Sequence, residues 1–229
     1  MGWGLPFEPK GTPIIAGGFA YVIYQGLNGG AGYKLPPYAE VLQIDFDRSG
    51  AIEKVEAKGG LANIFDRLDF DGDGAITKAE WDLTEQSDKA GSKLIAIPLG
   101  GAGDVTRSVA WTVSKSVPDV PSPALHDGVA YMVRDGGIFS SIDLKSGGVV
   151  KQGRLEGALD KYYASPVIAD NHIYCASQSG KVVVLKVGRQ WEVVAVNELD
   201  DEVYSTPAPL DGGLLVRTKS TLYRFGVGR

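Results

Sequence analysis

The stretch PSPALHDGVAYMVRDGGIFSSID, residues 121–143, contains a pattern that recurs along most of this 229-residue chain. It opens with Ser-Pro, runs apolar, turns at Asp127-Gly128 and runs apolar again. Related stretches begin at Gly11, Ala164 and Ser205, and each carries Ser-Pro or Thr-Pro near its start. Short apolar runs separated by glycine-containing turns are typical of β-strands joined as hairpins. The chain is therefore predicted to be mainly β.

The prolines of these repeats are regularly spaced. Pro123, Pro166 and Pro207 lie 43 and 41 residues apart, a period typical of β-propeller blades with four strands. Pro13 precedes Pro123 by 110 residues, which indicates that an inserted segment interrupts the first repeat. We therefore expect a β-propeller of about four blades, which could be half of a seven- or eight-bladed ring.

The inserted segment differs in charge from the repeats. Residues 33–92 contain 13 acidic and 7 basic side chains, so this segment accounts for the net charge of −5 on the whole chain. We expect propeller blades in residues 1–32 and 93–229, and a separate acidic insert in residues 33–92.

One repeat can be divided into strands completely. Four strands are predicted, at residues 124–126, 129–134, 138–143 and 149–152, with glycine-containing turns between them. The repeat that begins at Ala164 follows the same plan. The last repeat ends after three strands, so we expect its fourth strand to be missing.

The acidic insert contains the stretch DFDGDGAITKAE, residues 69–80. Oxygen-bearing side chains occupy positions 1, 3, 5, 9 and 12, and Gly74 occupies position 6, as in the twelve-residue calcium loop of an EF-hand. An apolar face upstream predicts the entering helix; it consists of Leu61, Ile64, Phe65 and Leu68. The predicted Ca²⁺ ligands are Asp69, Asp71, Asp73, the Ala75 carbonyl, Thr77 through a water, and Glu80. A solvated acidic turn would not require this register of glycine and glutamate.

A second loop, DFDRSGAIEKVE, lies upstream at residues 45–56. Its predicted ligands are Asp45, Asp47, Ser49, the Ala51 carbonyl, Glu53 and Glu56. Alternatively, residues 41–55 are two strands joined by a turn. The glutamate at position 12 and the neighbouring loop favour a paired EF-hand, in which the backbones of Ile52 and Ile76 would bond to each other. We expect one Ca²⁺ at residues 69–80, and a second if this loop also forms.

The turn SIDLKSGGVV, residues 141–150, resembles the Ala-x-Asp-x-x-Thr-Gly turn of quinoprotein-type (PQQ-like) β-propellers, a family that includes bacterial outer-membrane assembly propellers. Propeller repeats with an EF-hand insert are similar to large secreted bacterial proteins with PQQ-like repeats, which implies a periplasmic or extracellular location. The tryptophan that closes the family's turn is replaced near Lys151. The family's dehydrogenases use an adjacent Cys-Cys pair, whereas this chain has only Cys175. The cofactor PQQ is therefore not expected.

Composition argues against several other functions. The pI near 5.1, without a basic cluster, argues against nucleic-acid binding. No apolar run is long enough to span a membrane, and no signal peptide is visible. Both histidines, His126 and His172, fall at predicted hairpin turns, which argues against a Ser/His/Asp or zinc site.

These observations predict a calcium-binding β-propeller protein with a structural or recognition role, a protein or polymer ligand and no catalytic residues. One alternative is a quinone-dependent oxidoreductase, or a fragment of one. Another is a carbohydrate- or polymer-binding module. The ring would close in one of three ways: through residues 3–7, through a homodimer, or through further blades.

Overall fold

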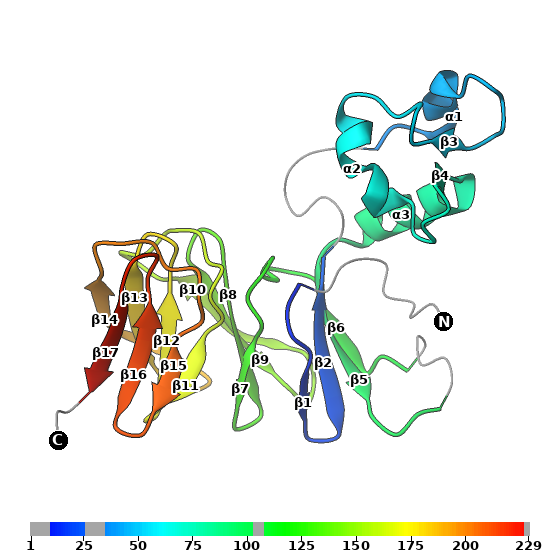
Figure 1. Cartoon of the computed structure of the whole chain (residues 1–229). Coiled ribbons are helices and arrows are strands. Elements are labelled where there is room, and N and C mark those ends of the chain that lie inside the picture. The colour runs from blue at the N-terminus through cyan, green and yellow to red at the C-terminus, as the bar shows by residue number, and fades with distance from the viewer. Residues whose placement is uncertain (1–9, 26–34, 103–107, 227–229) are drawn as a thin grey trace. The chain divides into compact units, whose positions relative to one another are not determined.

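The computed structural model describes residues 10–25, 35–102 and 108–226, with only the backbone of residues 87–90 (Figure 1). The chain forms two compact units. The propeller unit contains residues 10–24 and 92–226, and the helical unit contains residues 25–91. The stretch 3–7, considered above for ring closure, lies outside the described residues.

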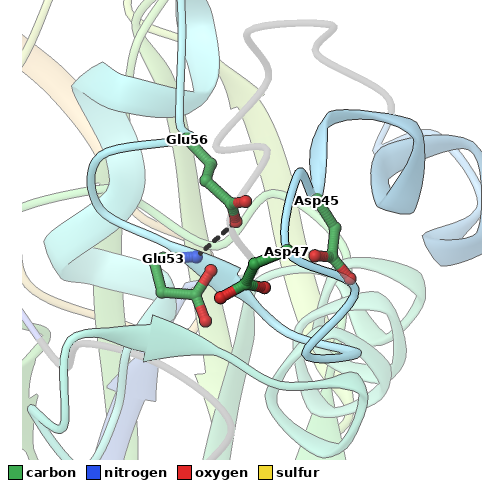
Figure 2. Close-up of side chains that lie close together, drawn as sticks. All are labelled: Asp45, Asp47, Glu53 and Glu56. Carbon is green, nitrogen blue, oxygen red and sulfur yellow. Dashed lines mark hydrogen bonds between the residues drawn. The ribbon is translucent and has the colours of Figure 1, made fainter.

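The described residues of the helical unit form four helices and a two-stranded sheet. Its elements are α1 (Tyr38–Val41), the 3-10 helix η1 (Leu42–Ile44), β3 (Ile52–Glu53), α2 (Gly60–Leu68), β4 (Ala75–Ile76) and α3 (Lys78–Ala90). Residues 41–44 are helical, so the alternative of two strands joined by a turn at residues 41–55 is wrong. The core includes Phe65, Leu68 and Trp81, each at most 1% exposed. The loop between η1 and β3 carries side chains that are drawn in Figure 2. None of the described helices is long and apolar enough to cross a membrane.

Within the described part of the propeller unit, the strands form four antiparallel sheets. The first contains β1 (Ile14–Ala16), β2 (Phe19–Tyr24), β5 (Lys93–Pro98) and β6 (Trp111–Val113). The second contains β7 (Ala124–His126), β8 (Val129–Arg134), β9 (Ile138–Asp143) and β10 (Val149–Arg154). The third contains β11 (Val167–Ala169), β12 (His172–Ala176), β13 (Lys181–Lys186) and β14 (Glu192–Glu198). The fourth contains β15 (Ala208–Leu210), β16 (Gly213–Arg217) and β17 (Leu222–Gly226).

Successive sheets in which each strand pairs with its neighbour along the chain are the blades of a β-propeller. The predicted mainly β fold is therefore confirmed. Three of the four strands predicted in the second sheet have the expected bounds, and the fourth, β10, continues two residues further. The extension arises because Gly153 and Arg154 still pair with Phe139 and Ile138 of β9.

Neighbouring sheets pack through alternate residues of the same strands. In β8, Tyr131 and Val133 belong to the apolar cluster shared with the third sheet, whereas Ala130 and Met132 belong to the cluster shared with the first. Successive side chains of a strand point to opposite faces, so one strand serves two junctions. Burial of each large apolar side chain contributes about 1.5–3 kcal/mol. Each blade therefore depends on its neighbours for stability.

A row of hydrogen bonds also joins the first residues of successive sheets. The Thr12 N–H donates to Ser122 Oγ at 2.8 Å, the Ser122 N–H to Ser165 Oγ at 2.9 Å, and the Ser165 N–H to Thr206 Oγ1 at 3.1 Å. Each acceptor is the residue before one of the regularly spaced prolines, which favours an extended backbone at that residue. The repeated Ser-Pro and Thr-Pro pairs therefore link one blade to the next.

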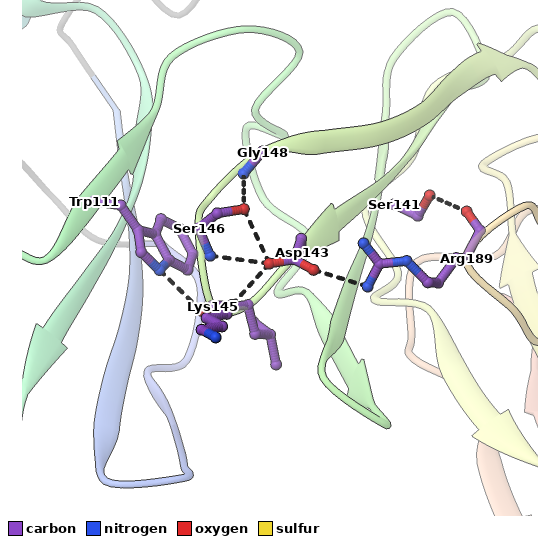
Figure 3. Close-up of polar contacts among 8 residues, drawn as sticks. Trp111, Ser141, Asp143, Lys145, Ser146, Gly148 and Arg189 are labelled. Carbon is purple, nitrogen blue, oxygen red and sulfur yellow. Dashed lines mark hydrogen bonds and ion pairs between the residues drawn. The ribbon is translucent and has the colours of Figure 1, made fainter.

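The turn between β9 and β10 contacts two neighbouring sheets (Figure 3). The Asp143 carboxylate accepts two backbone N–H bonds and the Ser146 hydroxyl within its own turn. Its other oxygen lies 2.8 Å from the guanidinium of Arg189, which belongs to the third sheet's β13–β14 connection. From the first sheet, the Trp111 indole N–H donates to the Leu144 carbonyl at 2.9 Å. The turn therefore fixes the positions of three blades.

A glycine is required in this turn. Gly147 has a φ of +70°, and a Cβ atom at this position would lie 2.8 Å from the Trp111 ring. Any side chain would therefore be strained and would displace the indole. This requirement explains the glycine of the Asp-x-x-Ser-Gly sequence.

We predict that Asp143→Asn lowers the melting temperature at pH 7. The hydrogen bond from Arg189 lowers the pKa of Asp143 to about 2. A carboxyl group whose pKa is lowered on folding stabilises the folded protein above its unfolded-state pKa of about 3.9. This stabilisation is lost as the pH falls through the folded-state pKa. The difference between wild type and variant should therefore shrink below about pH 4. Thermal circular dichroism across this range measures it. Asp200→Asn, at an exposed position, is the control, and a difference independent of pH would contradict the prediction.

Candidate metal centre

The two acidic loops of the helical unit lie side by side. β3 and β4 pair with Ile52 opposite Ile76, which confirms the predicted backbone contact between the loops. Both isoleucines are fully buried. The Tyr38 hydroxyl lies 3.0 Å from the carbonyl oxygens of both Gly50 and Ile76. Sequence reasoning missed this tyrosine as a link, because its acceptors are 12 and 38 residues away.

The downstream loop folds around the aspartate at its first position. Asp69 Oδ2 accepts the Gly74 N–H at 3.0 Å, while Asp69 Oδ1 accepts the N–H groups of Gly72 and Asp73. Carboxylate oxygens of Asp69, Asp71 and Asp73 lie within 4.8 Å of one another. Gly74 has a φ of +90°, a left-handed conformation that glycine adopts without strain. The loop therefore brings three of the predicted ligands together.

Glu80, at position 12, is held by the backbone of the same loop. Its Oε1 accepts the Phe70 N–H at 2.8 Å, and its Oε2 accepts the Thr77 N–H at 2.8 Å. The Glu80 N–H in turn donates to Thr77 Oγ1 at 3.3 Å. This reciprocal pair is a capping box at the start of α3. One glutamate therefore both starts the helix and turns its carboxylate toward the loop.

The upstream loop repeats this arrangement (Figure 2). Carboxylate oxygens of Asp45, Asp47, Glu53 and Glu56 lie within 4.8 Å of one another. Glu56 accepts the Phe46 N–H at 2.6 Å and the Glu53 N–H at 3.0 Å, at the same loop positions as the donors to Glu80. Glu56 is only 3% exposed.

In both loops, the residue predicted to supply a carbonyl ligand donates its N–H to the side chain at position 5. In the upstream loop, the Ala51 N–H donates to Ser49 Oγ at 3.2 Å. In the downstream loop, the Ala75 N–H donates to Asp73 at 2.9 Å.

The clustered carboxylates change one another's proton affinity. The contact between the side chains of Glu53 and Glu56 raises the pKa of Glu53 and lowers the pKa of Glu56. Burial acts to raise the pKa of Asp45, but backbone hydrogen bonds from Gly50 and its neighbours outweigh burial and lower that pKa. A cation close to these carboxylates would favour their charged forms.

The donor set fits a hard divalent cation. The clusters found in the described residues contain carboxylates only. Ca²⁺ takes roughly six to eight oxygen ligands, whereas Zn²⁺ prefers imidazole and thiolate. The two histidines have other surroundings: His126 lies 3.3 Å from the Asp127 carboxylate, and His172 lies 2.7 Å from the Asp170 carbonyl. Cys175 is fully buried, and burial raises the pKa of its thiol.

The two loops differ in how they end. The downstream loop continues into α3, whereas the upstream loop ends in a single turn, in which the N–H groups of Glu56 and Ala57 donate to the Glu53 carbonyl. Gly59, with a φ of +58°, then reverses the chain before α2. Within the described residues, the upstream loop therefore has no regular exiting helix. The upstream loop nevertheless gathers one carboxylate more than the downstream loop.

No family model and no curated protein matches the chain. Among solved structures, it is similar to BamB from Moraxella catarrhalis, with 20% identity and a TM-score of 0.47, over 58% of this chain and 40% of that chain. The computationally designed Ika4 protein matches with 12% identity and a TM-score of 0.45, over 59% and 80%. Quinohemoprotein alcohol dehydrogenase from Comamonas testosteroni matches with 14% identity and a TM-score of 0.37, over 44% and 17%. The chain thus spans two fifths of the BamB chain.

Proposed function

We propose that the helical unit is a pair of EF-hands that binds Ca²⁺, carried by a β-propeller with a structural or recognition role. The observation that supports this most strongly is the hydrogen-bond network shared by the two loops. In both, the aspartate at position 1 accepts the glycine N–H at position 6, and the glutamate at position 12 accepts the N–H groups at positions 2 and 9. Two loops of different sequence thus present their acidic side chains in the same way.

Bound Ca²⁺ would supply positive charge to sites that otherwise hold several carboxylates in contact. In the downstream loop we assign the ligands Asp69, Asp71, Asp73, Ala75, Thr77 and Glu80. In the upstream loop we assign Asp45, Asp47, Ser49, Ala51, Glu53 and Glu56. The residues next to these ligands, Ile52 and Ile76, are fully buried, so neutralising the loops would stabilise the core of the unit. A periplasmic or extracellular location, implied by the resemblance of the repeats, is part of this proposal.

Calcium binding is tested by thermal unfolding with and without Ca²⁺. Ca²⁺ should stabilise the helical unit by about 2.7 kcal/mol when its free concentration is roughly 100 times Kd. Glu80→Ala should remove most of this shift, because it deletes two ligand oxygens and half of the capping box. Glu56→Ala should remove less, because the upstream loop has serine at position 5 and no exiting helix.

Glu40→Ala, in α1 and outside both loops, serves as the control and should keep the full shift. Titration calorimetry on the same variants gives the number of ions bound. An equal Ca²⁺ shift in Glu80→Ala and wild type would rule out the assignment of residues 69–80.

We further propose that residues 33–92 form a removable insert. β2 and β5 are paired neighbours, with Tyr24 opposite Lys93, so the insert leaves and re-enters the sheet at adjacent points. Joining Gly32 to Lys93 with a short Gly/Ser linker should preserve strand-type circular dichroism and cooperative unfolding while abolishing Ca²⁺ binding. Loss of cooperative unfolding would mean that the blades require the insert.

Among the ways of closing the ring, we propose a homodimer in which two chains complete one ring. The row of hydrogen bonds that runs from Thr12 to Thr206 has two complementary ends. Within the described residues, neither the Thr12 hydroxyl nor the Thr206 N–H has a hydrogen-bond partner. Each end of one copy matches the opposite end of another, as in a closed dimer.

The dimer should show twice the chain mass of 24.3 kDa in light scattering at micromolar concentration. Thr12→Val, which removes the acceptor at the open end, should weaken the dimer. Ser165→Ala removes an acceptor of the same kind inside the chain, so it should lower the melting temperature and leave the dimer intact. A mass of 24.3 kDa with a sharp thermal transition would exclude the dimer.

A further inference from the structure

A cavity of about 560 Å³ lies between the third and fourth sheets of the propeller unit. Its walls are mostly apolar and come from both sheets; they include Tyr174, Val182, Val184, Asn197, Leu214 and Phe225. A cavity of this size is large enough to take an aromatic group.

The corresponding space between the second and third sheets is filled by a tryptophan. The Trp191 ring meets Phe139 edge-on, with centroids 5.0 Å apart, and the Lys151 ammonium lies 4.3 Å from the Trp191 ring centroid. A Cβ atom on Gly153 would come within 3.1 Å of the indole. Trp191 is 4% exposed and belongs to the cluster that joins these two sheets.

The strand register shows that the two spaces are equivalent. Phe139 is the second residue of β9 and pairs with Gly153 of the outermost strand. Val182 is the second residue of β13 and pairs with Asn197 of the outermost strand. The residues that contact Trp191 in one junction therefore correspond to residues that line the cavity in the next.

The opposite walls correspond as well. Ile173 and Leu185 of the third sheet pair with each other and belong to the cluster around Trp191. In the fourth sheet, Leu214 and Phe225 pair in the same way and line the cavity. Phe225 remains 43% exposed, whereas Leu185 is fully buried. The cavity is thus built like the space around Trp191, without an aromatic group from the described residues inside it.

Trp191 reaches its position because it immediately precedes β14, the outermost strand of the third sheet. β14 pairs with β13. The equivalent of β13 in the fourth sheet is β17, which among the described strands pairs only with β16. In the part of the chain that the structure describes, no strand preceded by an aromatic side chain pairs with the edge of β17 or fills the cavity.

We propose that the edge of β17 and this cavity together form a binding site for an extended peptide segment that carries a tryptophan. The segment would pair with β17 as a fourth strand, and its indole would enter the cavity. Main-chain hydrogen bonds to a sheet edge provide affinity in such complexes, while the side-chain pocket provides specificity. The indole would cover the exposed Phe225, whose counterpart Leu185 is buried in the cluster that contains Trp191. This binding would be independent of Ca²⁺ and of the proposed function.

The test uses the whole chain and a labelled synthetic peptide, QWEVVAVNE, which copies residues 190–198. Fluorescence anisotropy should show saturable binding, with equal affinity in Ca²⁺ and in EDTA. The same peptide with alanine in place of tryptophan should bind at least about tenfold more weakly, because the indole fills the pocket at the centre of the contact. Hydrogen–deuterium exchange should show slower exchange of the amides of Leu222–Gly226 in the complex.

Two variants test whether the peptide binds in the cavity. Val184→Trp fills the cavity and should abolish binding of the tryptophan peptide, whereas Val149→Trp adds the same side chain at an exposed position of β10 and should leave binding unchanged. If Val184→Trp does not fold, the comparison of the two peptides on the wild-type chain still decides the matter. Equal binding of both peptides, no saturation at millimolar peptide, or unchanged exchange in β17 would each overturn the proposal.

Discussion

The hydrogen bonds of Asp143 are the interaction on which the arrangement of the first three blades depends. Apolar clusters alone leave sheets free to slide, because apolar contact has no preferred direction. Asp143 accepts hydrogen bonds within its own turn and pairs with Arg189 of the third sheet, and the Leu144 carbonyl of the same turn accepts the Trp111 indole N–H. Directional bonds at one turn thus fix the positions of surfaces that the hydrophobic effect only brings together.

The strands of the second blade could be predicted because their signals are local. Alternating apolar residues and glycine turns mark β7, β8 and β9 within a few positions of each strand. The end of β10 could not be predicted, because it depends on pairing with Phe139 and Ile138. The Ser-Pro and Thr-Pro pairs were visible as a repeat. Their role in joining blades could not be predicted, because each hydroxyl oxygen accepts a hydrogen bond from a backbone N–H 41 to 110 residues away.

In the acidic loops, too, the features set by local sequence could be predicted and those that depend on distant residues could not. The pairing of Ile52 with Ile76 was predictable from the order of residues within each loop, and it is confirmed. The bond from Tyr38 to both loops was not, because nothing next to Tyr38 in the sequence indicates where its hydroxyl points. The assignment of Ca²⁺ itself stays a prediction. The spacing of carboxylates defines what kind of cation would fit, and only a binding measurement identifies the ion.

The pairing of Tyr24 with Lys93 has a consequence for how the first blade folds. These neighbours are separated by the whole helical unit, so forming the β2–β5 ladder from an unfolded chain closes a long loop and carries its entropic cost. If the helical unit has already folded, this loop is effectively shorter, because fewer residues between β2 and β5 remain free to move. The entropic cost of closing the first blade therefore depends on whether the insert has folded first. Whatever stabilises the acidic loops early in folding would also speed completion of a sheet that contains none of their residues.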